Sequence, residues 1–374
     1  MVYKYYMPTR VIAGRDCIVN SSGIFKTLGK KALLVTGANS AKRNGSEKDV
    51  KEALDSAGIS YVVFDRVMSN PTISCVYEGA SIAKEEGADF IIAIGGGSPM
   101  DAGKAIALLA AQDIKEENLF SGEYENKVLP MAFVPTTAGT GSEVTQYSIL
   151  TNDRAQTKTS IASDLLFPTV AFLDSKYMED LPAATTINTA VDALSHAVEG
   201  MLSARASAVS DGLASESVHL IVGCVPEMLR AAKSADHKSI SPEKRELLLQ
   251  ASFMAGMVIA QTGTTAVHAM GYSLTYFKDI DHGRANGLLL GEYLSLVEKE
   301  QPELAGRILK AMGLSSVGQF KELLNELLGR KEVITPEEIA RYSQLAIKTK
   351  NIGNCVVKPT EEAIREMFEA SFAG

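Results

Sequence analysis

The chain has little of what marks several large classes of protein. Positive charge is scarce, with 37 Lys and Arg against 45 Asp and Glu and a formal net charge of −8. Because nucleic acids and anionic membranes are bound mainly through basic patches, neither is expected as a partner. No apolar run approaches the roughly 20 residues of a membrane span, and the start, MVYKYYMPTR, has no run of signal-peptide length.

Cysteine is also scarce, and its spacing argues against a thiolate site. The four cysteines stand at positions 17, 75, 224 and 355, and no CxxC pair occurs. Neither a thiolate zinc site nor a redox dithiol is therefore indicated. Free thiols in a chain of this size are typical of a reducing compartment, so we expect a cytoplasmic protein.

What the chain does contain is enough apolar sequence for a large core. Hydrophobic residues make up 46% of its 374 positions, and this length favours two domains. In the first half, short runs rich in Val, Ile and Phe alternate with helical patterns, which predicts a parallel sheet with crossover helices. The expected strands begin at residues 32, 61, 90, 131 and 169, and the expected helices cover 46–57, 74–86 and 99–112.

After about residue 180 the character of the sequence changes. Ala-, Leu-, Met- and Glu-rich helical patterns continue from there to the C-terminus, and Pro182 marks a plausible boundary. We therefore predict an α/β dinucleotide-binding domain over residues 1–180 and an all-helical metal-binding domain over residues 181–374. The active site is expected in a cleft between them.

Two glycine-rich segments follow predicted strands. In IGGGSPMDAGKA, 94–105, Ser98 is expected to cap a helix whose first residue is Pro99. The free N–H groups of such a helix start suit a phosphate. The second segment, PTTAGTGSEVT, 135–145, offers hydroxyl and backbone donors. Taken singly, each could be an ordinary turn or surface loop, but in a parallel sheet both leave the carboxyl ends of strands, where such folds bind ligands.

Histidine is rare, and three of the five histidines stand in patterns that suit a metal. Asp192 and His196 are four residues apart in VDALSHAVEG and share a helix face. His268 lies in the helical TTAVHAMGYSL, and His282 begins HGRANGLLL after a polar turn. Three imidazoles and one carboxylate can bind zinc or ferrous iron, whereas a simple Asp–His pair and ordinary core histidines are the alternatives. Glu199, three residues after His196, is expected to face solvent. The two remaining histidines, His219 and His237, are expected to lie on the surface.

Taken in order, four motifs resemble the iron-containing (group III) alcohol dehydrogenases: GGGSPMD, PTTAGTGSEVT, DALSHAVEG and VHA…DHGRAN. That family has a dehydroquinate synthase-like fold, with a dinucleotide-binding domain, a helical domain and a metal in the cleft. The resemblance implies a metal-dependent, NAD(P)-dependent alcohol dehydrogenase that acts reversibly on a small alcohol or diol and its aldehyde. It also implies Fe²⁺, or Zn²⁺ in its place, and a homodimer or larger homo-oligomer.

The resemblance also assigns roles to individual residues. The metal ligands would be Asp192, His196, His268 and His282. The residues beside the cofactor would be Asn70, Gly96, Gly97, Ser98, Asp101, Thr136, Thr137, Thr140, Ser142 and Lys158. Many members have a further histidine near the nicotinamide, four residues after the first histidine of the VHA motif. Tyr272 stands at that position here, which makes it a further candidate catalytic residue.

The cofactor is expected to be NADP(H) in preference to NAD(H). In NAD-preferring members an aspartate often stands at the position of Gly37, where its carboxylate would repel a 2′-phosphate. Here Gly37 is followed by Ser40, Lys42 and Arg43, whose hydroxyl and basic groups suit a phosphate. The alternative is a solvated turn.

Two alternative enzymes share the fold. A dehydroquinate synthase-like lyase would offer a glutamate and two histidines to its metal, so the DALSH pair argues against it. A metal-free maleylacetate-type reductase is disfavoured by the complete ligand set. A non-catalytic binding protein is a third alternative, which an absence of NAD(P)H turnover would favour.

Overall fold

The computed structural model describes residues 3–372, which divide into two compact units. One consists of Tyr6–Thr137 and Gly141–Asp180, and we call it the sheet unit. The other, the helical unit, contains the N-terminal residues up to Tyr5, the segment Ala138–Thr140 and the chain from Leu181 onward. A three-residue piece of the second glycine-rich segment therefore packs with the helices.

The sheet unit is built on a six-stranded parallel sheet in the order β1-β8-β5-β4-β2-β3. Its strands are β1 (Arg10–Ala13), β2 (Lys31–Thr36), β3 (Ser60–Phe64), β4 (Phe90–Gly95), β5 (Met131–Pro135) and β8 (Val170–Leu173). The five predicted strands are confirmed. The short edge strand β1 and the antiparallel hairpin of β6 (Tyr147–Asn152) and β7 (Thr157–Ala162) were not predicted. The hairpin strands are rich in Thr, Ser and Asn, so they lack the apolar run that identified the others.

Helices cover both faces of this sheet. They are α1 (Cys17–Asn20), α2 (Ser40–Arg43), α3 (Ser46–Ala57), α4 (Ile73–Glu85) and α5 (Gly97–Ala111). Short 3-10 helices lie at Ser22–Thr27, Glu116–Asn118, Ser142–Val144, Asp164–Leu166 and Ser175–Met178. The three predicted helices are α3, α4 and α5, each confirmed to within two residues at either end.

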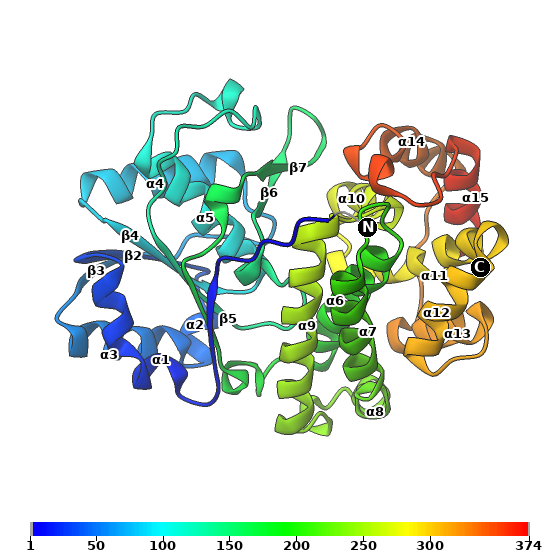
Figure 1. Cartoon of the computed structure of the whole chain (residues 1–374), viewed down its shortest axis with the longest axis horizontal. Helices are drawn as coiled ribbons and strands as arrows, with labels where there is room; N and C mark the ends of the chain where they lie inside the picture. Colours follow the sequence, from blue (N-terminus) through cyan, green and yellow to red (C-terminus); the bar gives the residue numbers. More distant parts are fainter. Residues whose placement is uncertain (1–2, 373–374) are drawn as a thin grey trace. The chain divides into compact units, whose positions relative to one another are not determined.

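Successive side chains of β2 divide between two hydrophobic cores. Leu33 and Val35 pack with residues of α4 and α5, whereas Ala32 and Leu34 pack with residues of α1 and α3. Figure 1 shows these two helix pairs on opposite sides of β2–β4. Both faces of the sheet are therefore buried, as continuous apolar strands in a parallel sheet require.

The helical unit consists of helices, as predicted. They are α6 (Ala183–Met201), α7 (Ala208–Val222), α8 (Val225–Ser234), α9 (Pro242–Thr262), α10 (Ala266–Lys278), α11 (His282–Glu300), α12 (Pro302–Met312), α13 (Val317–Leu328), α14 (Pro336–Ala346) and α15 (Glu361–Phe372), with 3-10 helices at His237–Ser239 and Lys350–Asn354. Helix α6 packs against α7, α9 and α11 (Figure 1), and every residue from Ala190 to Met201 is buried. Any polar side chain in that stretch must therefore find a partner inside the protein.

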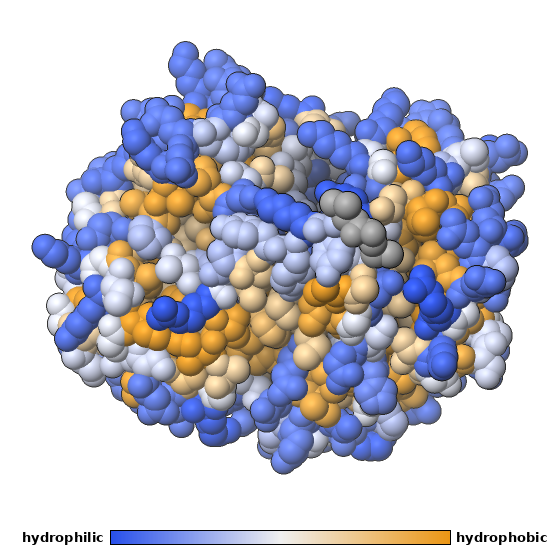
Figure 2. Space-filling view, in the orientation of Figure 1, coloured by the Kyte–Doolittle hydropathy of each residue, from blue (hydrophilic) through white to orange (hydrophobic). Residues whose placement is uncertain are grey.

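One face of the surface carries both hydrophilic and hydrophobic residues (Figure 2). Hydrophilic residues cover much of the face drawn in Figure 2, with hydrophobic patches between them. Among residues 3–372 no single helix has the length and hydropathy needed to cross a membrane, although α7 with α8, and α9 with α10, meet both criteria when each bent pair is taken together.

Candidate functional site

Three predicted metal ligands meet inside the helical unit. Asp192 and His196 lie one turn apart on α6, and His268 comes from the first turns of α10. One ligand atom from each lies within 4.8 Å of the others, and the three residues are only 3–4% exposed. The Nε2 atoms of His196 and His268 are 3.0 Å apart. Two helices thus bring the Asp–His pair and a distant histidine to one buried point.

The fourth predicted ligand, His282, is the first residue of α11 and lies beside this group. Its ring centre is 5.1 Å from that of His268. Asn286, one turn further along α11, has its Nδ2 3.3 Å from His282 Nε2 and 3.1 Å from His268 Nε2. Tyr272 is half-buried beside them. Its ring is stacked on that of His282, with 5.9 Å between the ring centres, and lies at 80° to that of His268, with 6.3 Å between the centres.

The charges in this cluster favour a bound cation. Burial alone would raise the pKa of Asp192, but the neighbouring imidazoles and the hydrogen bond from Asn286 outweigh burial and lower that pKa. Burial lowers the pKa of His196 despite the opposing charge of Asp192, so the imidazole is held neutral with a lone pair available. A carboxylate and neutral imidazoles are the forms that bind metals.

Glu199 belongs to the same site, and the expectation that it faces solvent is wrong. It is fully buried on α6, and its Oε2 accepts a hydrogen bond from His268 Nδ1. Its Oε1 accepts from the backbone N and the Oγ1 of Thr265, at 2.8 and 2.7 Å. Burial opposes ionisation, but these contacts together lower the pKa of Glu199. Its position among buried apolar residues was the signal that could have identified it.

These residues fit a divalent cation. With His268 Nδ1–H donating to Glu199, the Nε2 of the same ring carries a lone pair and faces the Nε2 of His196. The nitrogen and oxygen donors suit zinc or ferrous iron. His219 is exposed, as predicted, and His237 is half-buried outside this cluster.

In the sheet unit, predicted cofactor residues gather at the carboxyl ends of three adjacent strands. Gly37 follows β2, Gly96 follows β4 and Thr136 follows β5. Asn70 has a positive φ of 58°, and its backbone N–H donates to Ser98 Oγ at 3.2 Å. Parallel α/β sheets bind their ligands at this edge.

The glycine turn itself is tightly packed. A Cβ added to Gly96 would lie 3.0 Å from Thr137 Oγ1, so a larger residue there would have to shift the Thr137 side chain. Helix α5 begins at Gly97, with Gly96 at the N-cap position and no side-chain cap. The expected Ser98 cap and the Pro99 helix start are therefore wrong, because Ser98 Oγ binds Asn70 instead.

The other predicted cofactor residues are less closely grouped. Two of them are in contact, since Ser142 Oγ donates to Asp101 at 2.7 Å. Lys158 lies on a different element, the hairpin strand β7, and Ser40 is the first residue of α2. The charge of Lys158 nevertheless acts on Asp101. Thr140 belongs to the helical unit.

Beneath this turn lies a buried polar network that the sequence did not reveal. Lys104 of α5 is fully buried and donates to Ser142 Oγ at 2.8 Å, Thr145 Oγ1 at 3.1 Å and the carbonyl of Tyr147 at 2.8 Å. Burial lowers the pKa of Lys104 to about 8 and raises that of the neighbouring Glu143 to about 7. The network ties residues 142–147 to helix α5.

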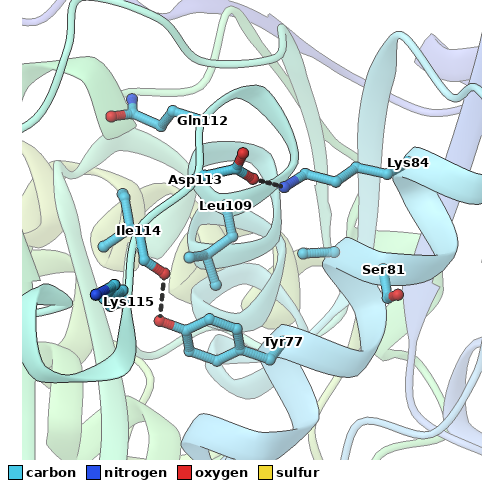
Figure 3. A pocket seen from close by; sticks show the side chains of 9 residues that line it. Tyr77, Ser81, Lys84, Leu109, Gln112, Asp113, Ile114 and Lys115 are labelled. Carbon is cyan, nitrogen blue, oxygen red and sulfur yellow. Dashed lines mark hydrogen bonds and ion pairs between the residues drawn. The ribbon is translucent and has the colours of Figure 1, made fainter.

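A surface pocket lies at the opposite end of α5 from the glycine turn. It has a volume of about 360 Å³ and is bordered by Tyr77, Lys84, Leu109 and Asp113, among others (Figure 3). Tyr77 donates to the carbonyl of Ile114 at 2.9 Å, and Lys84 pairs with Asp113 at 2.7 Å. None of the predicted site residues borders it.

Comparison with known proteins places the chain in one family. The iron-containing alcohol dehydrogenase family matches residues 8–175, and the C-terminal part of the same family matches residues 186–372. The chain belongs to the iron-containing alcohol dehydrogenase family. This membership confirms the resemblance that the four motifs carry, and with it the prediction of an NAD(P)-linked alcohol dehydrogenase.

Individual relatives cover nearly the whole dehydrogenase chain. Lactaldehyde reductase of Escherichia coli (strain K12) is 30% identical over 363 residues, which span 92% of either protein. The 1,3-propanediol dehydrogenase of Klebsiella pneumoniae is 35% identical over 367 residues, with the same coverage. The crystal structure of an iron-containing alcohol dehydrogenase from Thermotoga maritima is 38% identical, covers 100% of both chains and superposes with a TM-score of 0.91.

Proposed function

We propose that this alcohol dehydrogenase uses a divalent cation held by Asp192, His196, His268 and His282. The observation that carries the proposal is the buried convergence of Asp192, His196 and His268, with His282 beside them. Fe²⁺ is the proposed metal because of the family, and Zn²⁺ is the alternative because such ligands bind it more tightly. When bound, the cation supplies Lewis-acid chemistry to the oxygen of the alcohol or aldehyde.

The protein's own groups would orient and charge this site. Glu199 holds His268 with Nε2 free of hydrogen, and Asp192 supplies the negative charge. Because Asp192, His196 and His268 are buried, bulk water is largely excluded from them, whereas His282 is half-buried. A metal-free reductase would have no use for this arrangement.

The cofactor residues would bind NAD(P) at the carboxyl edge of the sheet. The nicotinamide is the hydride carrier, and the protein's part is to hold it. The free N–H groups at the start of α5 and the hydroxyl-rich turn would bind the pyrophosphate and ribose. The proposed set is Gly37, Ser40, Asn70, Gly96, Gly97, Ser98, Asp101, Thr136, Thr137, Thr140, Ser142 and Lys158. In this proposal residues 1–180 bind the dinucleotide and residues 181–374 the metal.

NADP(H) is the proposed preference. A glycine at position 37 carries no carboxylate to repel a 2′-phosphate, and Ser40 and the exposed Arg43 follow it. Lys42 contributes less than the sequence suggested, because it is ion-paired with Asp65 at 2.6 Å.

Gly37→Asp tests this preference. A Cβ there would lie 3.2 Å from the carbonyl of Val67, so Gly37→Asn serves as the control for bulk alone. Gly37→Asp should lower the ratio of kcat/KM for NADP(H) to kcat/KM for NAD(H) by roughly tenfold to a hundredfold. This factor corresponds to the free energy of one charge-assisted hydrogen bond to the phosphate. A wild type that prefers NAD(H), or an unchanged ratio in the Asp variant, would refute the preference.

The proposed substrates are a small alcohol or diol and the corresponding aldehyde. Relatives named for lactaldehyde and 1,3-propanediol support this choice. The test is a panel of small alcohols, diols and aldehydes with metal-reconstituted protein and both cofactors. Steady-state NAD(P)H turnover with at least one small substrate is expected, and its absence over the whole panel would contradict the proposal.

The proposal also covers the oligomeric state of the protein and the compartment in which it works. A homodimer or larger homo-oligomer is expected from the family, and light scattering would measure it. The four cysteines are all free and buried, which suits a reducing compartment such as the cytoplasm.

A further inference from the structure

The side chain of Asn286 lies where three predicted metal ligands meet. Its Nδ2 is 3.0 Å from Asp192 Oδ1, 3.1 Å from His268 Nε2 and 3.3 Å from His282 Nε2. The residue is fully buried on α11, one turn after His282. One amide nitrogen therefore contacts ligand atoms from α6, α10 and α11.

The other end of this amide is held by nothing else. Within residues 3–372, Asn286 Oδ1 has no hydrogen-bond partner although it is buried. An unsatisfied buried polar atom costs about 1–3 kcal/mol. The hydrogen bond that Nδ2 donates to Asp192 Oδ1 is therefore the one that orients the amide, since Oδ1 makes none among the described residues.

Gly271 makes room for that end of the amide. It lies on α10 between His268 and Tyr272, and a Cβ there would be 2.2 Å from Asn286 Oδ1. A glycine inside a helix costs about 1 kcal/mol relative to alanine. The space that it leaves is what lets Asn286 turn its nitrogen toward the ligand atoms.

We propose that Asn286 is a positioning residue of the metal centre, and that Gly271 acts through it. A carboxylate oxygen has more than one lone pair, so Asp192 Oδ1 can accept from Asn286 and still face a cation. The hydrogen bond then fixes Asp192 beside the histidine nitrogens before the metal arrives. This inference rests on the proposed metal site, and it predicts a loss of metal affinity without a change in the ligands themselves.

The test is the Zn²⁺ affinity of the metal-free protein, measured by competition with a chromophoric chelator. Asn286→Ala should weaken Zn²⁺ binding roughly tenfold to a hundredfold, as loss of a group that orients a ligand does. Gly271→Ala should weaken it similarly, because the added methyl group displaces the amide. The double variant should bind no more weakly than Asn286→Ala alone, since the side chain that the methyl would strike is gone.

Ser371→Ala is the matched control. Ser371 of α15 is buried and donates to the carbonyl of Leu288 at 2.8 Å. Leu288 lies on α11, as Asn286 does, but outside the ligand cluster. The substitution should leave Zn²⁺ affinity unchanged. The visible spectrum of the Co²⁺-loaded protein is a second measurement, which a change in protein stability alone would not alter. Asn286→Ala should change the positions and intensity of the Co²⁺ bands, and Ser371→Ala should not.

The outcomes separate this inference from the proposed function. Wild-type Zn²⁺ affinity and Co²⁺ spectrum in both Asn286→Ala and Gly271→Ala would overturn the inference. Additive losses in the double variant would overturn the part assigned to Gly271. If circular dichroism shows that Asn286→Ala does not fold, the Zn²⁺ affinity and Co²⁺ spectrum of Gly271→Ala decide whether the inference holds. If wild type binds no Zn²⁺, or His268→Ala binds it equally well, the proposed metal site itself fails.

Discussion

At the residue scale, the site depends on which nitrogen of His268 carries hydrogen. Glu199 accepts from Nδ1, which leaves the lone pair on Nε2, opposite His196. Thr265 holds the other oxygen of the same carboxylate by two hydrogen bonds. A carboxylate behind a histidine sets both its tautomer and its orientation as a metal ligand.

Glu199→Gln should therefore weaken metal binding. With Thr265 still donating to the amide oxygen, the new amide nitrogen would face His268 Nδ1 and favour the tautomer that has hydrogen on Nε2. We expect Zn²⁺ affinity to fall roughly tenfold to a hundredfold, measured by chelator competition, with Glu216→Gln at an exposed position of α7 as the control. Unchanged affinity would show that Glu199 supports only the packing of α6.

Tyr272 gives a second prediction at this scale. Tyr272→Phe keeps the ring that stacks on His282 and removes only the hydroxyl group. If protons leave through solvent or the cofactor ribose, kcat should fall less than about tenfold. A loss of about 10²–10⁴-fold, the usual contribution of a general acid or base, would identify Tyr272 as the proton carrier.

Sequence reasoning reached the residues that carry a recognisable pattern and missed those that serve them. Asp192 and His196 share a helix face by spacing, and the resemblance linked them to His268 and His282. Glu199 and Asn286 have no such pattern, because their partners come from other helices. Only the three-dimensional packing of α6, α10 and α11 brings them together.

At the element scale, α5 and the segment after β5 act as one piece. Lys104 joins them, and Glu143 is buried beside it, with only 1% of its surface exposed. The folded pKa of Glu143, about 7, is raised above its ordinary value of 4.5, chiefly by burial. A carboxyl group whose pKa is higher in the folded than in the unfolded chain contributes its full stability at pH values below the unfolded-state pKa. That contribution is lost as the pH rises through the folded-state pKa.

Glu143→Gln should remove this pH dependence. From pH 6 to pH 8 the ionisation of Glu143 should lower the free energy of unfolding of the wild type by about 1 kcal/mol, and the Gln variant should lack that loss. Urea unfolding at both pH values measures the difference, with Glu123→Gln at an exposed position as the control. The same pH dependence in wild type and Glu143→Gln would contradict the assignment.

Elements were predictable where hydrophobic pattern alone determines them. The strands β2, β3, β4, β5 and β8 carry apolar runs, and α3 to α5 carry helical periodicity between them. The N-terminus of α5 was misplaced because Ser98 looked like a cap, whereas its Oγ is used by Asn70 from another loop. The polar hairpin β6–β7 has no apolar run to reveal it.

At the scale of the whole molecule, the two units contribute different chemistry. The sheet unit presents glycine-rich turns at the carboxyl edge of β2, β4 and β5, and the helical unit brings Asp192, His196 and His268 together. Family membership extends over both units, from residue 8 to residue 372 with a short gap. The family and the fold class could be predicted from four motifs, whereas the alcohol that is oxidised has no comparable signature.

The central claim is that Asp192, His196, His268 and His282 hold the metal of this dehydrogenase. The most direct measurement is the metal content per chain, by elemental analysis, of the wild type, His268→Ala, His282→Ala and the exposed-site control His219→Ala. The account predicts close to one divalent metal ion per chain in the wild type and in His219→Ala, and loss of most metal in the other two variants, with circular dichroism unchanged. Full metal occupancy in both His268→Ala and His282→Ala would contradict it.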